Sequence, residues 1–165
     1  MLKRVTQVEP GTVRRLVDLY RESMDQLARN FESPQAMEQA YEEFLKEFVT
    51  HDRQMVLVEE VDGEWVSALR CVESATGVWF LEALETAPQA RGKGCAKQLM
   101  KHTQELLTGQ GAGELFSLVS PRNTPSIATH VACGFVATDR QPINGWGEEE
   151  PGMILYAWQL SLIHI

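Results

Sequence analysis

The chain has 165 residues, of which 44% are hydrophobic and 23% charged, and its formal net charge is −8. This length suits one compact domain, and the composition is that of a globular protein rather than a disordered or fibrous chain. We therefore expect a single domain over residues 1–165. The acidic balance argues against a nucleic-acid partner, which needs a basic surface. No run of about 18 apolar residues occurs, so no membrane span or membrane partner is predicted.

The cysteines and histidines show neither a disulfide framework nor a metal site. Cys71, Cys95 and Cys133 lie far apart in the sequence, and no CxxC pair occurs. An odd, unpaired set of thiols is typical of a reducing compartment, and the N-terminal segment lacks the apolar core of a signal peptide. We therefore predict a cytoplasmic protein. The 4 histidines have no metal-ligand spacing, so no metal is predicted.

The first half of the chain predicts a strand, two amphipathic helices and a β-hairpin. The strand alternates apolar and polar residues, and the helices carry apolar side chains at helical spacing. Ser33 and Pro34 have the arrangement of an N-cap followed by the first helical residue, and Asp62-Gly63 is a two-residue hairpin turn. The expected elements are a strand Lys3–Val8, helices Thr12–Asn30 and Pro34–Phe48, and strands Gln54–Val61 and Glu64–Val72.

The second half predicts four strands and two helices. The segment Leu115–Val119 is almost wholly apolar, which is typical of a buried strand. Gly134 is placed to end the predicted helix Thr124–Cys133. The order of elements predicts a mixed α/β fold with a partly antiparallel sheet. The expected elements are strands Val78–Thr86, Leu115–Val119, Phe135–Ala137 and Met153–Leu160, and helices Gly92–Leu107 and Thr124–Cys133.

A glycine-containing turn, Gln89-Ala90-Arg91-Gly92-Lys93-Gly94-Cys95-Ala96, joins the strand that ends at Thr86 to the next helix. Amide groups at a helix N-terminus lack intrahelical partners, and glycines let an anion approach the main chain. The turn is therefore either a phosphate site or a plain strand-to-helix connection. No P-loop run occurs, and Lys97 occupies the third glycine position of a dinucleotide-binding pattern. These mismatches disfavour a dinucleotide-dependent oxidoreductase.

The turn and its surroundings resemble the GCN5-related N-acetyltransferase (GNAT) family. Gln89-x-x-Gly92-x-Gly94 is similar to that family's Q/R-x-x-G-x-G/A signature. The strand Trp79–Leu84 resembles the family's central strand, and Asn123 and Gly134-Phe135 resemble two further landmarks. The element order also matches, so the resemblance covers nearly the whole chain. It implies one GNAT-like domain with about six to seven strands, about four helices and splayed central parallel strands.

The resemblance implies that the chain binds acetyl-CoA, or another acyl-CoA, as a co-substrate. The main chain of Leu84, Glu85 and Thr86 would pair with the pantetheine amides and stabilise the oxyanion. Asn123 would contact the cofactor, cap the next helix, or do both. The pyrophosphate would bind amides of the turn, namely those of Arg91, Gly92, Lys93, Gly94, Cys95 and Ala96.

The same resemblance implies direct attack by an acceptor amine, which needs a base for the amine and an acid for the departing thiolate. Glu82 is the first candidate base, because it precedes the bulge expected in this strand and shares a cleft-facing side with Phe80 and Leu84. Its alternative roles are binding of a cationic acceptor and an ion pair with a neighbouring strand. Glu85 is the second candidate, although its side chain is expected to point away from the cleft.

His130 is the candidate acid. It lies four residues before Gly134, where many members of the family have a tyrosine. A histidine near the departing sulfur could donate a proton or a hydrogen bond to it. The alternatives are a partly exposed histidine without a chemical role and protonation of the thiolate by solvent.

The predicted function is N-acetyl transfer to a primary amine of a small molecule or peptide. The alternative is a non-catalytic acyl-CoA-binding or regulatory module on the same fold. The acidic loop Asn144–Glu150 is either solvated or a lid that attracts a cation. A homodimer through the last strands or the tail Leu160–Ile165 is also considered. Five aromatic residues of the first two helices form core or line the acceptor pocket: Tyr20, Phe31, Tyr41, Phe44 and Phe48.

Overall fold

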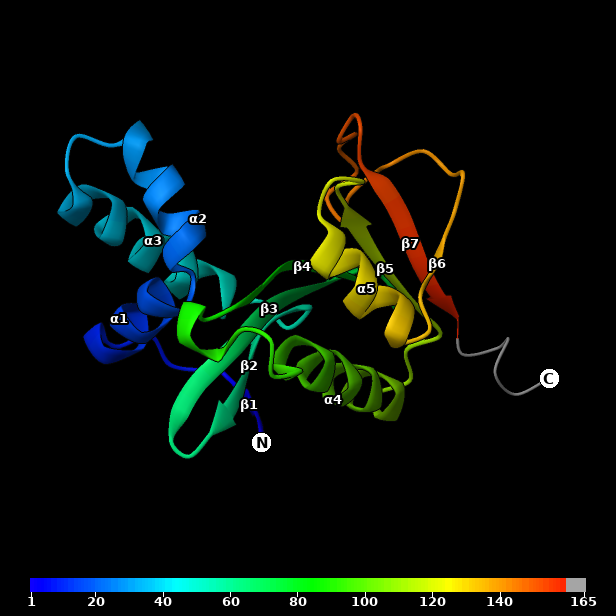
Figure 1. The fold of residues 1–165 in the computed structure, drawn as a ribbon, viewed down its shortest axis with the longest axis horizontal. Helices are drawn as coiled ribbons and strands as arrows, with labels where there is room; N and C mark the ends of the chain where they lie inside the picture. The colour runs from blue at the N-terminus through cyan, green and yellow to red at the C-terminus, as the bar shows by residue number, and fades with distance from the viewer. Residues whose placement is uncertain (160–165) are drawn as a thin grey trace.

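The computed structural model describes residues 1–159 and shows a seven-stranded sheet of order β1-β2-β3-β4-β5-β7-β6 (Figure 1). Only β4 and β5 pair in parallel, and the other neighbours pair antiparallel, which confirms the mixed sheet. The predicted dimer contact at Leu160–Ile165 lies outside the described residues. The strands are β1 Leu2–Arg4, β2 Gln54–Val61, β3 Glu64–Ala75, β4 Val78–Thr86, β5 Glu114–Val119, β6 Val136–Ala137 and β7 Ile154–Gln159.

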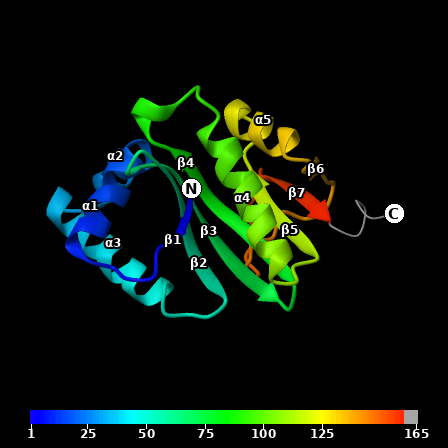
Figure 2. The ribbon, with the colours of Figure 1, turned by 90° about the horizontal axis from the view of Figure 1, so that it is seen from below.

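Within residues 1–159, five α-helices cover the two faces of the sheet, with α1–α3 on one face and α4, which contacts α5, on the other (Figure 2). The predicted helix Thr12–Asn30 is broken at Tyr20, whose backbone leaves the helical region at φ −84° and ψ 29°. None of the described helices is long and apolar enough to cross a membrane. The helices are α1 Pro10–Leu19, α2 Arg21–Leu27, α3 Pro34–Phe48, α4 Cys95–Gly109 and α5 Thr124–Ala132, with 3-10 turns η1 Ala28–Asn30 and η2 Pro88–Ala90.

Side-chain alternation along the central strands divides the core into two layers. On β2, Val56 and Val58 face the layer that includes α1–α3, whereas Met55 and Leu57 face the layer that includes α4. Because both faces are covered, the segment Met55–Val58 of β2 is apolar and buried throughout. The hydrophobic run that predicted β2 therefore reflects burial on two sides.

The parallel strands β4 and β5 diverge along their length, as Figure 1 shows. They pair only from Val78–Glu114 to Leu81–Ser117. Beyond Leu81, β4 stays paired with β3 as far as Thr86, but within the described chain it has no further pairing with β5. This confirms the predicted splay and leaves main-chain groups of β4 free on the side of β5.

Candidate functional site

A bulge in β4 decides which of its carboxylates face α1–α3. Ala83 has a φ of 55°, and the register between β3 and β4 shifts from Arg70–Glu82 to Ala68–Glu85. Glu85 is three residues after Glu82 on β4, whereas their partners Ala68 and Arg70 are two residues apart on β3. The extra residue in β4 places Glu82 and Glu85 on the same face of the sheet. The expectation that Glu85 points away from the cleft is wrong for this reason.

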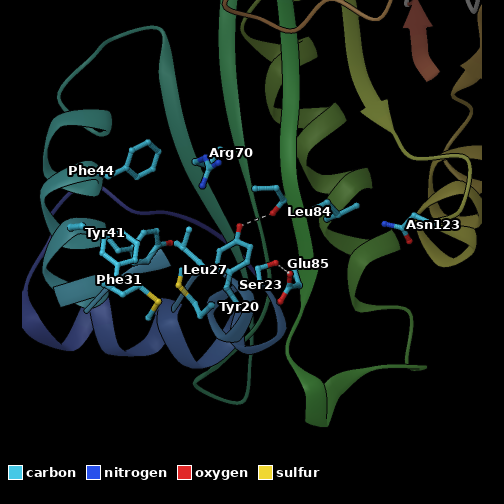
Figure 3. Close-up of a pocket in the computed structure, with 14 residues that line it drawn as sticks. Tyr20, Ser23, Leu27, Phe31, Tyr41, Phe44, Arg70, Leu84, Glu85 and Asn123 are labelled. Carbon is cyan, nitrogen blue, oxygen red and sulfur yellow. Dashed lines mark hydrogen bonds between the residues drawn. The ribbon is translucent and has the colours of Figure 1, made fainter. Parts of the chain in front are cut away.

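The main cavity, of about 590 Å³, lies between this face of the sheet and the helices α1–α3 (Figure 3). Four of the five aromatic residues considered from the sequence line it: Tyr20, Phe31, Tyr41 and Phe44. The fifth, Phe48, is buried in the core. A cavity of this volume and apolar character is typical of a small-molecule site.

Glu85 and Arg70 are the charged residues in the lining of the main cavity. Glu85 accepts a hydrogen bond from Ser23 Oγ at 2.5 Å through Oε1, while its Oε2 is buried without a partner among the described residues. The Arg70 Nε atom is also buried without a hydrogen bond, and it lies 3.5 Å from Glu82 Oε1. A buried carboxylate oxygen without a hydrogen bond is costly, so Glu85 Oε2 can accept a bond from a ligand or a water molecule.

Tyr20 holds the bulge and contributes a neutral phenol to the cavity. Its Oη donates a hydrogen bond to the Ala83 carbonyl oxygen at 2.7 Å, which satisfies a main-chain acceptor at the irregular position. Burial raises the pKa of Tyr20 well above its ordinary value, and burial raises the pKa of Tyr41 to about 12. Both phenols are therefore protonated at neutral pH.

Glu82 lines a second cavity of about 220 Å³, on the other side of Ala83. Trp146 and Glu150 of the acidic loop also line this second cavity. The loop packs tightly on β4, since a Cβ added at Gly145 would lie 3.2 Å from the Phe80 Cβ. Glu82 is 36% exposed and forms an ion pair with Arg70, which was one of its predicted alternatives.

The glycine turn presents main-chain amides at the start of α4. Gly92 and Gly94 have φ values of 76° and 77°, and the helix begins at Cys95 rather than at the predicted Gly92. A Cβ on either glycine would meet no atom within 4 Å, so the turn has an open surface. Within the described chain, no backbone amide from 91 to 97 donates a backbone hydrogen bond, whereas Gln98 N donates to Gly94 O at 3.0 Å. Such a run of amides can bind an anion.

The other main-chain groups predicted to bind the cofactor lie on β4 and before α5. Glu85 and Thr86 pair with β3 on one side, and their other side faces the gap to β5. Leu84 packs against the core on the α4 side, so the prediction that it shares a face with Glu82 is wrong. Asn123 lines the main cavity and caps α5, accepting a hydrogen bond from Ser126 N at 3.2 Å, which confirms its capping role.

His130 is buried, and both of its ring nitrogens have partners. Nδ1 lies 2.7 Å from the Ser126 carbonyl oxygen, and Nε2 lies 2.8 Å from Ser117 Oγ. A carbonyl only accepts, so Nδ1 carries the proton and Nε2 accepts from the hydroxyl. Burial lowers the pKa of His130, and the residue lines neither the main nor the second cavity. Because the N–H on Nδ1 is already bonded, these contacts argue against proton donation from His130 to the thiolate, which stays a prediction.

The buried His130 is expected to make the protein less stable as the pH falls below about 6.5. Its pKa is lower in the folded than in the unfolded state, so the unfolded chain binds the proton more readily. The stabilisation is complete above the unfolded-state pKa and is lost as the pH falls toward the folded-state value. One such proton gives a slope of at most about 1.4 kcal/mol per pH unit.

Urea unfolding between about pH 5 and pH 7.5 measures this slope. His130→Asn is expected to reduce the slope, and the matched variant His51→Asn, at an exposed position, is expected to retain it. An unchanged slope in His130→Asn would contradict the assignment.

Comparison with known sequences supports an acetyltransferase relationship. The model of the acetyltransferase (GNAT) family matches residues 15–135. Aminoglycoside N(6')-acetyltransferase type 1 of Salmonella typhimurium is 43% identical over 63 residues, which are 38% of this chain and 43% of that protein. Streptothricin acetyltransferase of Streptomyces lavendulae is 38% identical over 55 residues, which are 33% of this chain and 29% of that protein. The matched regions thus span less than half of these relatives.

Solved structures match the fold over nearly its full length. PaiA N-acetyltransferase from Thermoplasma acidophilum, in complex with coenzyme A, has a TM-score of 0.71 at 14% identity, covering 96% of this chain and 99% of that one. Spermidine N-acetyltransferase from Vibrio cholerae, in complex with CoA and spermine, has a TM-score of 0.67 at 16% identity, covering 98% and 95%. The family model covers most of the chain, and the splayed strands and glycine turn agree with it. The chain belongs to the acetyltransferase (GNAT) family.

Proposed function

We propose that the protein transfers an acetyl or other acyl group from acyl-CoA to a primary amine by direct attack. The observation that carries this proposal is the divergence of β4 from β5 beside the glycine turn. Because the two strands diverge, β4 has a free edge on the side of β5. In the turn that follows it, the described backbone amides from 91 to 97 donate no backbone hydrogen bond. Membership of the family supports the same reaction. Both features suit a long ligand with amide groups at one end and phosphates at the other.

The cofactor-binding residues follow from these two features. We assign the pyrophosphate to the amides of Arg91–Ala96, where the open surface at both glycines supports close approach of an anion. We assign the pantetheine to the free edge of Leu84–Thr86, which supports pairing in the manner of an added strand. An amide of this edge stabilises the oxyanion that forms when the amine attacks the thioester. Asn123 is close enough to the main cavity to contact the ligand as well as cap α5.

Glu82 and Glu85, the two carboxylates beside the bulge, have different roles toward the acceptor amine. Glu85 binds the acceptor ammonium, supported by its buried, unpartnered Oε2. A carboxylate that pairs with an ammonium also stabilises the protonated form, so a different group is needed to take the proton. Glu82 is that base, acting through water, and its partial exposure supports proton release to solvent. Solvent then protonates the thiolate, because the N–H of His130 is already bonded.

The acceptor that we propose is a small-molecule amine, since the main cavity has the volume of a small-molecule site. The acidic loop beside Glu82 supports the attraction of a cation. We place the protein in the cytoplasm, which the free thiols of Cys71, Cys95 and Cys133 support.

Thiol release during incubation with acetyl-CoA and a panel of primary amines tests the proposed function. We expect at least one amine to raise the release of free CoA above the rate of acetyl-CoA hydrolysis, with the acetylated amine detected by mass spectrometry. Calorimetry with CoA accompanies the assay. Binding without transfer to any amine would favour the non-catalytic acyl-CoA-binding module. Absence of both binding and transfer would contradict the proposed function.

A further inference from the structure

The polar groups of the main cavity indicate which class of amine it accepts, an inference that rests on the proposed function. Among residues 1–159, Glu85 is the one carboxylate in the lining; its Oε1 accepts from Ser23 and its Oε2 lacks a partner. One buried carboxylate oxygen can receive one ammonium group. No other carboxylate of the described part of the chain lines the main cavity, so this lining offers no anionic partner for a second cation.

Arg70 puts a positive charge in the same lining. Figure 3 shows it beside Phe44, on a different side of Tyr20 from Glu85 and Ser23. Its Cζ lies 5.0 Å from the centre of the Phe44 ring, and its charge is matched by the Glu82 carboxylate at 3.5 Å. Toward a ligand the guanidinium offers N–H donors and no acceptor. A second ammonium here would meet a like charge in a partly desolvated place.

Much of the remaining wall provides apolar contact. Met24, Met37, Leu27 and Phe31 line the cavity together with Phe44. The phenols nearby are neutral, since burial raises the pKa of Tyr41 to about 12. A hydrated ammonium placed against the methionine and leucine side chains of this wall would lose water without gaining a hydrogen-bond acceptor from them, which is costly.

We propose that the acceptor is a primary amine with one positive charge and an apolar body, and that Arg70 excludes acceptors with a second ammonium. The charges support this class. Arg70 neutralises Glu82, so Glu85 leaves one net negative charge, and one ammonium balances it. An apolar body then buries its surface against the aromatic and methionine side chains of the wall. The positive charge of a second ammonium would then have no negative charge in the lining to balance it.

A matched pair of amines tests the proposal. 1-Hexylamine and 1,5-diaminopentane have chains of equal length and differ in a terminal methyl or ammonium group. We expect kcat/KM of the wild type to favour 1-hexylamine by about 100-fold, the range by which a buried pocket discriminates a mismatched group. Arg70→Gln removes the repelling charge, so the preference is expected to fall about tenfold.

The ratio of the two kcat/KM values is the readout, because a general loss of activity or stability cancels in it. Arg70→Lys keeps the charge and is expected to keep most of the wild-type ratio. Arg53→Gln is the matched control. It removes another arginine that pairs with a glutamate of β3, Glu73, at an exposed position outside both cavities, and the ratio should not change.

Three results would overturn the inference. A wild type that acetylates 1,5-diaminopentane as well as 1-hexylamine would show that a second charge is accepted. An unchanged ratio in Arg70→Gln would remove Arg70 from selection. Failure of both amines to react with, or to bind by calorimetry to, the CoA-loaded protein would exclude the apolar class. Loss of CoA binding itself would instead contradict the proposed function, so the two failures are distinguishable.

Discussion

Gly94→Asp is expected to lower the affinity for acetyl-CoA by about 100-fold or more, while the sheet stays folded. Gly94 is the N-cap residue of α4, between the amides to which we assign the pyrophosphate. A carboxylate there repels the phosphates and competes for the same N–H donors. The left-handed backbone at this position, with φ 77°, adds strain for any residue with a Cβ, of about 1–3 kcal/mol.

Two variants separate charge from strain. Gly94→Ala brings the strain without the charge, so its loss of affinity should be much smaller. Gly63→Asp brings both to the β2–β3 turn, where the glycine also has a positive φ, of 81°, and open space around it. That control should bind acetyl-CoA like the wild type. Calorimetry measures affinity, and circular dichroism reports the fold. Equal affinities of Gly94→Asp and Gly63→Asp would show that the phosphate binds elsewhere.

Elements that depend on local chemistry could be predicted from the sequence. Ser33 caps α3, accepting a hydrogen bond from Ala36 N at 3.1 Å, as the Ser33-Pro34 pair predicts. Asp62 and Gly63 have φ values of 51° and 81°, as a two-residue hairpin turn requires. These signals concern neighbouring residues, so no knowledge of the tertiary fold is needed to find them.

Features that depend on contacts between distant segments could not be predicted. The family resemblance implies a bulge in this strand, but no residue marks Ala83 as its position, because alanine is not a residue that favours positive φ. Strict alternation of side chains along this strand therefore predicts the wrong face of the sheet for Glu85. The break of the first helix at Tyr20 likewise has no glycine or proline to mark it. Tyr20 instead bonds through Oη to the carbonyl oxygen of Ala83 itself, so one tertiary contact accompanies both irregularities.

The role of His130 was also a question of tertiary packing. Its spacing from Gly134 suggested equivalence with a tyrosine, but the shorter imidazole reaches Ser117 on β5 instead of a cavity. The ring is also 5.1 Å from Phe135 in an edge-on arrangement. Sequence spacing locates the residue on α5 and cannot say which partner its side chain meets.

Glu82→Gln and Glu85→Gln are expected to change different kinetic constants. Glu82→Gln removes the proposed base, so kcat should fall by about 10²–10⁴-fold with a nearly unchanged KM for the amine. Gln keeps an oxygen that can face Arg70, which limits structural disturbance. Glu85→Gln removes the oxygen that receives the ammonium, so the KM for the amine should rise more than kcat falls.

Both variants should bind acetyl-CoA normally, because the cofactor is assigned to main-chain groups rather than to these side chains. Glu73→Gln, on the neighbouring strand and outside both cavities, is the matched control and should leave all constants unchanged. Formate should restore part of kcat in Glu82→Ala, since a small carboxylate can occupy the space and accept the proton. It should not restore a variant whose defect is amine binding. A kcat defect in Glu85→Gln that formate relieves in Glu85→Ala would instead make Glu85 the base, and a normal kcat in Glu82→Gln would assign deprotonation to water alone.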